Sequence, residues 1–258
     1  MATPDQKARV QAQFGEHAPY YTTSATHAGG ESLARLVTLA QPGPDDLALD
    51  VATAAGHNAL SFAAYVRHVI GLDLTREMLP AARQLAQQRE RRNVSWSQGD
   101  AECLPFGDDC FDLVTCRIAP RHFPDVGLAV QEMARVCRPG GCVAICDNIT
   151  PEDFDAAAYV NAFEIRRDPS HHCAYSLGEW REVIYRAGLM LEGAETLSKS
   201  FQLESWAARM NVPEERMVEL RQELWHAPPL ARAYFNPRTE QDSTFFDLTE
   251  GVLIGRKT

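Results

Sequence analysis

Short apolar runs alternate along this chain with segments of helical periodicity, and the first such pair organises the rest of the chain. The run 47–51, interrupted by Asp50, predicts a short buried strand. A loop of small residues, 52–56, separates it from the helical stretch 58–64. Strand, tight turn and helix form the first unit of an open α/β sheet. Unpaired N–H groups at the helix start make such a turn a ligand site.

The same alternation continues to the end of the chain. Apolar runs predict further strands at 68–74, 94–97, 111–116, 142–147, 189–198, 245–248 and 252–254. Apolar stripes at helical spacing predict helices at 6–14, 31–40, 75–92, 125–137, 151–169 and 179–187. We therefore expect a doubly wound α/β fold, in which helices cover both faces of a mainly parallel sheet.

Two helical segments do not fit this alternation. Residues 1–40 are expected to form a helical lead-in that Pro19 interrupts. Residues 201–235 favour helix and are rich in aromatic side chains, although the sheet is already covered by its own helices. We expect this segment to be a helical cap over a substrate pocket. Because no repeat or linker separates these parts, residues 1–258 are interpreted as one domain.

Composition and charge narrow the class of protein. With 45% hydrophobic and 23% charged residues, the chain resembles ordinary globular proteins, and its net charge of −10 disfavours DNA or RNA as a partner. No apolar run reaches the roughly 18 residues of a membrane span, and the N-terminus lacks the apolar core of a signal peptide. The seven cysteines match no zinc spacing. We expect a cytoplasmic protein with reduced thiols and no metal; a homodimer is compatible with the sequence.

The loop after the first strand resembles a known motif. The stretch 50–57, DVATAAGH, is similar to the glycine-rich first motif of class I methyltransferases that use S-adenosylmethionine (SAM). Residues 138–141, RPGG, lie between a helix and an apolar strand, as in this family, and the resemblance is closest to its ubiquinone/menaquinone-biosynthesis type. It implies a Rossmann-like seven-stranded sheet with an antiparallel last strand. Ala52 and Ala54 replace glycines, which costs roughly 1–2 kcal/mol wherever the backbone is left-handed.

Two acidic residues are the strongest candidates for cofactor contact. Asp73 ends the second strand, where a carboxylate accepts hydrogen bonds from both ribose hydroxyls of a nucleotide-like cofactor; the alternative is a helix N-terminal neighbour. The resemblance implies that Asp100 and Ala101 bind adenine, against the alternative of a plain turn. The remaining contacts to SAM that it implies are Tyr21, Asp50, Ala52, Thr53, Gly56, Leu74, Met78 and Arg117.

Three histidines are candidates for the chemistry. Methyl transfer from SAM requires in-line geometry and, where the nucleophile carries a proton, a base. His122 follows the fourth strand, and His171 and His172 lie in a later loop near the same edge of the sheet. An imidazole suits the task of the base, and a packing or surface role is the alternative for each histidine.

Arg117 is a candidate for steadying a substrate oxygen or the carboxylate of SAM. Its alternative role is a structural ion pair with Asp147 or Glu164. Relatives commonly carry Ala-His where this chain has Pro120 and Arg121, so one further candidate base is missing here.

These observations predict an enzyme that transfers a methyl group from SAM to a carbon or oxygen of a small aromatic or quinone-like metabolite, with S-adenosylhomocysteine as product. An alternative keeps the fold and SAM without methyl transfer, as in a cyclase or pericyclase of natural-product biosynthesis. A non-catalytic binding protein is a third hypothesis. A dinucleotide oxidoreductase is disfavoured, because the G-x-G-x-x-G fingerprint is missing.

Overall fold

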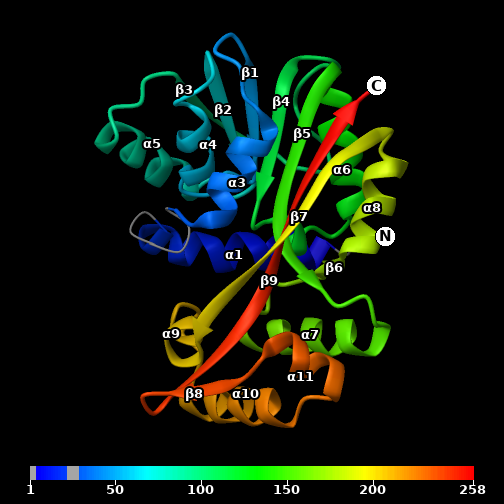
Figure 1. Ribbon diagram of the computed structural model, residues 1–258. Coiled ribbons are helices and arrows are strands. Elements are labelled where there is room, and N and C mark those ends of the chain that lie inside the picture. The colour runs from blue at the N-terminus through cyan, green and yellow to red at the C-terminus, as the bar shows by residue number, and fades with distance from the viewer. Residues whose placement is uncertain (1–3, 22–28) are drawn as a thin grey trace.

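The computed structural model describes residues 4–21 and 29–258, with side chains for residues 6–16 and 29–258 (Figure 1). The strands in this part are β1 (Leu47–Val51), β2 (His68–Asp73), β3 (Val94–Gln98), β4 (Phe111–Arg117), β5 (Cys137–Thr150), β6 (Tyr175–Ser176), β7 (Leu189–Gln202), β8 (Arg238–Glu240) and β9 (Ser243–Lys257). The helices are α1 (Pro4–Tyr21), α3 (Glu31–Ala40), α4 (His57–Phe62), α5 (Met78–Gln88), the 3-10 turn η1 (Pro120–His122), α6 (Val126–Val136), α7 (Phe154–Arg167), α8 (Leu177–Arg186), α9 (Leu203–Ala208), α10 (Glu214–His226) and α11 (Pro229–Phe235).

The strands form one sheet in the order β3-β2-β1-β4-β5-β9-β7, and the short strands β6 and β8 pair with β5 and β9. Strands β1 to β5 run parallel, and β9 is antiparallel to both β5 and β7. The chain builds outward from β1 to β3 and then returns to β4, so the order reverses between β1 and β4. Ligands of open α/β sheets bind at the carboxyl ends of the strands at such a reversal. The predicted doubly wound, Rossmann-like fold is therefore confirmed.

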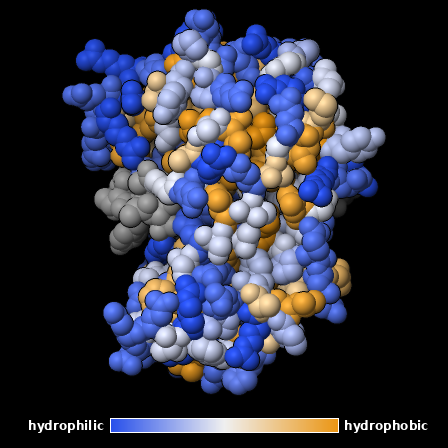
Figure 2. All heavy atoms as spheres, in the orientation of Figure 1, coloured by the Kyte–Doolittle hydropathy of each residue, from blue (hydrophilic) through white to orange (hydrophobic). Residues whose placement is uncertain are grey.

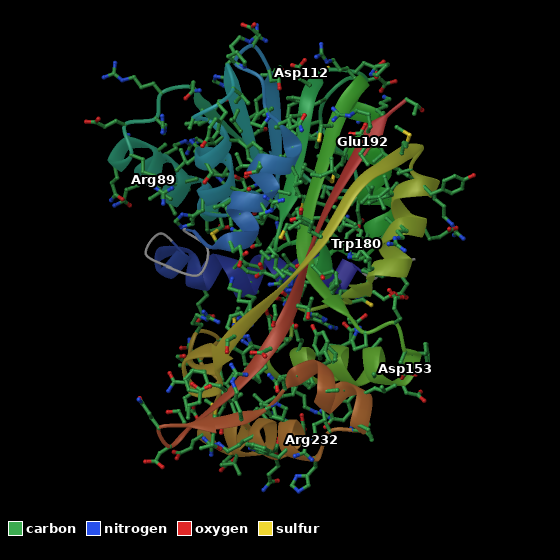
Figure 3. All side chains as sticks on the ribbon, viewed as in Figure 1. Arg89, Asp112, Asp153, Trp180, Glu192 and Arg232 are labelled. Atoms are coloured by element: carbon green, nitrogen blue, oxygen red, sulfur yellow. The ribbon has the colours of Figure 1, made fainter. Side chains whose placement is uncertain are left out.

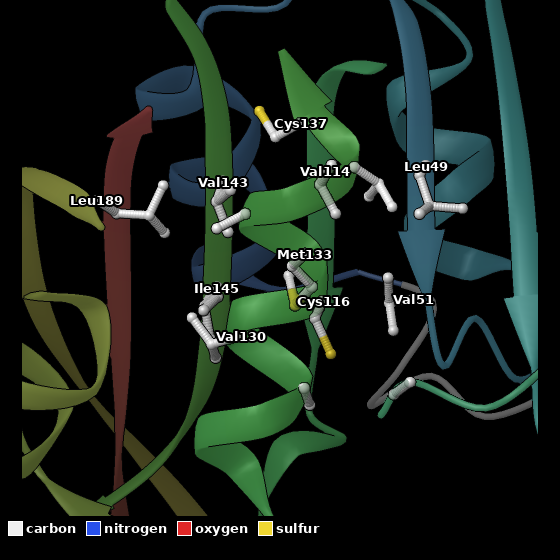
Figure 4. Packing of buried hydrophobic residues seen from close by; sticks show 14 of the residues in the cluster. Leu49, Val51, Val114, Cys116, Val130, Met133, Cys137, Val143, Ile145 and Leu189 are labelled. Carbon is white, nitrogen blue, oxygen red and sulfur yellow. The ribbon is translucent and has the colours of Figure 1, made fainter. Parts of the chain in front are cut away.

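Helices cover both faces of the parallel strands because each presents an apolar stripe to them. On one face Leu36 of α3 and Phe62 of α4 pack against the sheet with Cys142 and Cys146. On the other face α6 and α8 contribute buried residues, and Figure 4 shows Val130 and Met133 of α6 against Val143 and Ile145 of β5. The cysteines of β5 thus act as small core residues, as expected. Within the described ranges no group of side chains has the make-up of a metal site.

Strands β7 and β9 are much longer than the sequence pattern indicates. They stay paired from Leu189 and Lys257 to Gln202 and Phe245, well beyond the parallel strands. The prediction of short strands at 189–198, 245–248 and 252–254 is wrong in extent. The cause is visible in β9, where buried Phe246, Leu248 and Glu250 alternate with more exposed neighbours. This period of two marks a half-buried strand, whose polar positions resemble breaks.

Below the parallel sheet the ends of β7 and β9 join α7, α9, α10, α11 and β8 in a second packed region, here called the lower lobe (Figure 1). Its centre is aromatic: the ring of Phe163 stacks on Trp206, with centroids 5.4 Å apart, and Phe246 meets Trp206 edge-on at 4.9 Å. Figure 2 shows a mainly hydrophilic surface on this lobe. The predicted cap segment 201–235 lies here, but α10 and α11 pack on α7, and only residues 201–211 reach the cavity at the strand ends.

Helix α1 crosses the molecule between the parallel sheet and the lower lobe (Figure 1). It runs unbroken to Tyr21, so the predicted interruption at Pro19 is wrong. Pro19 is close enough to the end of the helix that the missing N–H and the ring disturb only its last turns. The residues 138–141, RPGG, belong to strand β5, which begins at Cys137, and Gly140 adopts φ +75° within it.

Two further sequence features behave as the pattern indicates. Ser176 and Glu179 form a reciprocal capping box at the start of α8, which fixes where that helix begins. None of the helices in residues 4–21 and 29–258 is long and apolar enough to cross a membrane.

Candidate active site

A cavity of about 420 Å³ opens at the carboxyl ends of β1, β2 and β4. Its sheet-side wall consists of residues 52–58, 72–78 and 99–102, and its lobe-side wall consists of cavity-lining residues from α7, β7, α9, β9 and 208–211. Residues 117–124, which follow β4, lie between these walls, and α1 adds Lys7, Val10 and Phe14. Segments far apart in the sequence therefore meet at one ligand-sized space.

The loop after β1 has an unusual backbone. Ala52 has φ +55°, Ala54 φ +47° and Gly56 φ +84°, so three alternate residues are left-handed. The two alanines occupy the conformation that glycine favours, at a cost of roughly 1–2 kcal/mol each. At Gly56 a Cβ atom would lie 2.6 Å from the Trp96 ring, so this position excludes a side chain for a second reason.

Asp50, in strand β1, anchors this loop through hydrogen bonds. Its carboxylate accepts hydrogen bonds from the Thr53 hydroxyl (2.6 Å), the Asn58 amide (2.6 Å), the Thr115 hydroxyl (3.0 Å) and the Ala59 N–H (3.0 Å). Burial raises its pKa despite these donors. Asp50 does not line the cavity, and its four partners occupy its acceptor positions. It supports the strained loop and offers nothing directly to a ligand.

Asp73 is also a buried aspartate, but unlike Asp50 it faces the cavity. It lines the cavity, and its carboxylate accepts one hydrogen bond at each oxygen, from the N–H of Ala54 (2.7 Å) and the N–H of Thr75 (2.8 Å). The Thr75 side chain is hydrogen-bonded to the same carboxylate, so three donors hold it and an acceptor position is left for a ligand. Burial raises the pKa of Asp73 to about 6, against the two N–H donors, which lower it. Asp73 thus presents to the cavity an acceptor group that its backbone donors hold in place.

Asp100 and Ala101 also line the cavity, beside a residue that the sequence does not indicate. Lys7 of α1 places its ammonium 2.6 Å from both the Asp100 and the Glu102 carboxylates. The second oxygen of Asp100 accepts the N–H of Glu102 at 3.0 Å. An adenine amine at Asp100 would share this carboxylate with Lys7. No local pattern marks Lys7, because it comes from a helix more than ninety residues away in sequence.

His122 is the only one of the three candidate histidines that lines the cavity in the described part of the chain. Its Nδ1–H donates to the Ser170 carbonyl at 3.0 Å, and the Ser170 hydroxyl donates to Asp168 at 2.6 Å. Because Nδ1 carries the proton, Nε2 carries the lone pair, and Nε2 has no partner among the described residues. Burial lowers the pKa of His122 to about 4, aided by the charge of Arg121. Phe14 of α1 packs edge-on against its ring at 5.1 Å.

His171 and His172 lie elsewhere. His171 is buried behind the cavity wall, where its Nε2 is 2.8 Å from the Asn161 carbonyl oxygen and its Nδ1 is 3.5 Å from Glu164. Burial lowers its pKa to about 3. His172 is exposed and outside the cavity lining. The structure therefore gives these two histidines no contact position, because the loop that carries them turns away behind α7.

Arg117 lines the cavity, and its role as a contact residue stays a prediction. Asp147, the acid of its alternative ion pair, is held by Arg121 instead, which donates its backbone N–H at 2.7 Å and its Nη1 at 2.6 Å. Both members of that pair are nearly buried. Arg121 thus performs a structural task in addition to lining the cavity.

Some of the other predicted cofactor contacts line the cavity and others do not. Ala52, Thr53, Leu74 and Met78 line the cavity, whereas Gly56 shapes the loop without reaching it. The side chain of Tyr21 lies outside the described residues. Trp206 belongs to the aromatic segment 201–235, the predicted cap of the pocket, whereas no sequence pattern indicates Glu164 and Arg167 of α7 as lining residues.

An open α/β sheet with a cavity at its reversal point and a buried carboxylate ending β2 is typical of proteins that bind a nucleotide-like cofactor. Comparison with known proteins makes this specific. A family model described as a methyltransferase domain matches residues 49–145. The uncharacterized methyltransferase YcgJ of Bacillus subtilis is 37% identical over 222 residues, which cover 86% of this chain and 88% of the relative. The chain therefore belongs to the class I SAM-dependent methyltransferases.

Solved structures agree with this assignment. The crystal structure of YcgJ matches with a TM-score of 0.83 at 36% identity, covering 88% of this chain and 97% of that one. A putative methyltransferase from Bacillus halodurans matches with a TM-score of 0.84, also at 36% identity, covering 88% and 99%. A demethylmenaquinone methyltransferase of Clavibacter sepedonicus is 32% identical over 147 residues, or 55% of this chain and 59% of the relative. The protein is a SAM-dependent methyltransferase by family.

Proposed function

We propose that this enzyme transfers the methyl group of SAM to a carbon or oxygen of a small aromatic or quinone-like metabolite and releases S-adenosylhomocysteine. One observation carries the proposal: a single cavity is lined both by Asp73 and by His122, whose buried Nε2 has no partner among the described residues. The quinone-like class is supported by the partial similarity to a demethylmenaquinone methyltransferase. A small substrate also suits the cavity volume of about 420 Å³ beside a cofactor.

The sheet-side wall fits SAM. The carboxylate of Asp73, which lines the cavity, suits the ribose hydroxyls, and Asp100 with Ala101 lies just after β3 for the adenine. The left-handed loop 52–56 brings backbone rather than large side chains to the cavity, which suits the methionine part. When bound, SAM supplies an electrophilic methyl group on a sulfonium ion.

His122 is the proposed base. Ser170 and Asp168 fix the imidazole with its Nδ1–H bonded, so that Nε2 accepts the proton of a substrate hydroxyl. Its pKa of about 4 keeps the ring neutral throughout the physiological range. Phe14 of α1 packs on the ring, and the low exposure of His122 limits its contact with water. Arg117, which also lines the cavity, is proposed to steady the oxygen that loses the proton.

The remaining predictions about organisation belong to this proposal. We infer that residues 1–258 act as one catalytic domain with the lead-in 1–40, and that the capping part of 201–235 is 201–211, supported by its cavity-lining residues. A cytoplasmic location, the absence of a nucleic-acid partner and a homodimer stay predictions.

The test combines SAM calorimetry with detection of S-adenosylhomocysteine in reactions with a panel of phenols and quinols. We expect SAM to bind and at least one compound to release the product. Absence of SAM binding by the folded protein would overturn the proposal. SAM binding with no release across a broad panel would favour the non-methylating alternative, a cyclase or pericyclase. His122→Gln separates the steps, because SAM should still bind while release falls.

A further inference from the structure

The lobe-side wall and the adjoining residues after β4 are rich in cations, although the chain as a whole has a net charge of −10. The cavity-lining cations of this part are Arg117, Arg121, Arg167, Lys199 and Arg209, and its cavity-lining acids are Glu164 and Glu250. Burial lowers the pKa of His122 to about 4 and that of His171 to about 3, so both rings are neutral and balance no charge here.

Two of these cations already have carboxylate partners. Lys199 lies 3.0 Å from Glu250, and Arg121 lies 2.6 Å from Asp147. Glu164 accepts the Asn148 amide at 3.1 Å. The acids Glu250, Asp147 and Glu164 are therefore engaged by other residues, and none of them pairs with Arg167.

Arg167, the last residue of α7, differs from Lys199 and Arg121 because it has no carboxylate partner among the described residues. Its side chain lines the cavity at only 8% exposure, and within the described residues no carboxylate oxygen lies within 4 Å of it. Its Nε–H donates to the Trp206 carbonyl at 3.1 Å, and its guanidinium carbon lies 4.3 Å from the centre of the Trp206 ring. These contacts fix the plane of the guanidinium and leave both Nη groups without a protein acceptor in this part of the chain.

The electrostatic surroundings agree with this geometry. The pKa of Arg167 is lowered to about 10, mainly by burial and also by the charges of Arg209 and Arg121, whereas Asp168 and Glu164 act to raise it. A buried arginine whose cationic form is disfavoured gains from an added anion. Arg209, on the exposed end of the same wall, lies with its guanidinium carbon 5.6 Å from the Phe201 ring centre.

Building on the proposed methyl transfer, we propose that the substrate carries a carboxylate or phosphate group, which the two Nη groups of Arg167 bind. A planar guanidinium matches the oxygen spacing of either group and binds it through two hydrogen bonds. Arg209 adds positive charge where the anion enters. The apolar part of the substrate then extends toward Phe14, Met210 and Leu248, which also line the cavity. The anion would lie at the lobe end of the cavity, and the group to be methylated beside His122.

The test measures binding of three probes by calorimetry: phenyl phosphate, benzoate and the neutral benzamide. Each titration is run with and without saturating S-adenosylhomocysteine, so failure of cofactor binding would contradict the proposed function and leave the anion test intact. We expect one of the anions to bind at least about tenfold more tightly than benzamide. The anion that binds more tightly identifies the group as phosphate or carboxylate.

Variants assign the preference to one residue. Arg167→Gln should remove the preference, and Arg167→Lys should retain part of it. Arg232→Gln is the matched control, because Arg232 also lies over an aromatic ring, that of Trp225, but is exposed on α11 far from the cavity (Figure 3). If Arg167→Gln does not fold, the exposed Arg209→Gln decides, with an expected loss of at least about threefold in anion affinity.

Three results would overturn the proposal. The first is equal affinity of the wild type for all three probes. The second is no detectable binding of either anion at about ten millimolar, a concentration at which even weak specific sites fill. The third is an unchanged preference in folded Arg167→Gln or, where that variant is unfolded, in Arg209→Gln.

Discussion

The two walls of the cavity differ in how they are built and in their charge. The sheet-side wall is made of loops that directly follow β1, β2 and β3, and its charged residues, Asp73, Asp100 and Glu102, are acidic. The lobe-side wall is assembled from α7, β7, α9 and β9, and most of its charged residues are basic. One wall offers acceptors for the hydroxyls and amine of a nucleoside, and the other offers donors for an anion.

This difference arises from the two kinds of packing. In a parallel sheet every strand ends at the same edge, so three short loops reach one place without further arrangement. The lobe-side wall exists only because β7 and β9 stay paired as far as Phe201 and Phe246, which brings α9 against α7. The first wall is therefore local in sequence and the second is long-range. Substitutions in each wall, and between them, can test the two separately.

The largest effect is expected between the walls, at His122. Replacing the proposed base by His122→Gln should lower kcat about a hundredfold or more, because Nε2 no longer accepts a proton. SAM affinity should change by less than about threefold, since the sheet-side wall is untouched. The measurement is steady-state kinetics with a substrate from the phenol and quinol panel. His226→Gln, on the exposed surface of α10, is the control and should leave both quantities unchanged. Normal turnover in folded His122→Gln would exclude the histidine from the chemistry.

On the sheet-side wall, Asp73→Ala should weaken SAM binding more than tenfold. Two charge-assisted hydrogen bonds to the ribose are lost, each worth about 1.5–3 kcal/mol. Calorimetry measures the affinity, and Asp112→Asn is a suitable control. Asp112 also caps a strand, through the Leu47 N–H at 2.7 Å, but lies at the opposite edge of the sheet (Figure 3). Equal SAM affinity in folded Asp73→Ala and wild type would refute the ribose contact.

The sequence predicts the elements that carry the sheet-side wall but indicates little of the lobe-side wall. The reason is that the first is local in sequence and the second is long-range. The stretch 47–147 has a continuous pattern of apolar strands and striped helices, so its elements and the place of Asp73 can be predicted from local periodicity. The roles of Arg167 and Trp206 depend on how α9 docks on α7, which no local pattern encodes. A position near the carboxyl edge of the sheet was also not sufficient to identify a cavity-lining histidine. Of the three candidates there, only His122 lines the cavity.

A smaller effect concerns His171, which lies behind the lobe-side wall. Its pKa is about 3 in the folded protein and about 6.5 when unfolded, so below pH 6.5 the unfolded chain takes up a proton that the folded protein does not. This linkage lowers the free energy of unfolding by up to about 1.4 kcal/mol per pH unit as the pH falls from 6.5. His122 acts in the same direction, and Asp73, whose pKa is raised to about 6, acts in the opposite one.

The difference between variants isolates the contribution of His171. Chemical denaturation at pH 6.5, 5.5 and 4.5 should show a shallower loss of stability in His171→Gln than in wild type, by about 1 kcal/mol per pH unit. Its neighbour provides the control, because His172 is exposed and His172→Gln should leave the slope unchanged. Parallel slopes for wild type and His171→Gln would mean that the ring is not held neutral.

The smallest effect is expected in the loop of the sheet-side wall. Ala54 adopts φ +47°, and Ala54→Gly removes a strain of roughly 1–2 kcal/mol while adding an entropic cost of at most about 1 kcal/mol, so stability should rise slightly. Ala55→Gly is the matched control next door. Ala55 is fully buried outside the left-handed region, so losing its methyl group should only destabilise. In a methyltransferase whose loop has adapted to alanine, Ala54→Gly should leave turnover unchanged or slightly lower, with SAM affinity within about threefold. If the variant binds SAM much more tightly and still releases no S-adenosylhomocysteine, the alanine has displaced the methionine part. The sheet-side wall would then hold SAM for a purpose other than methyl transfer.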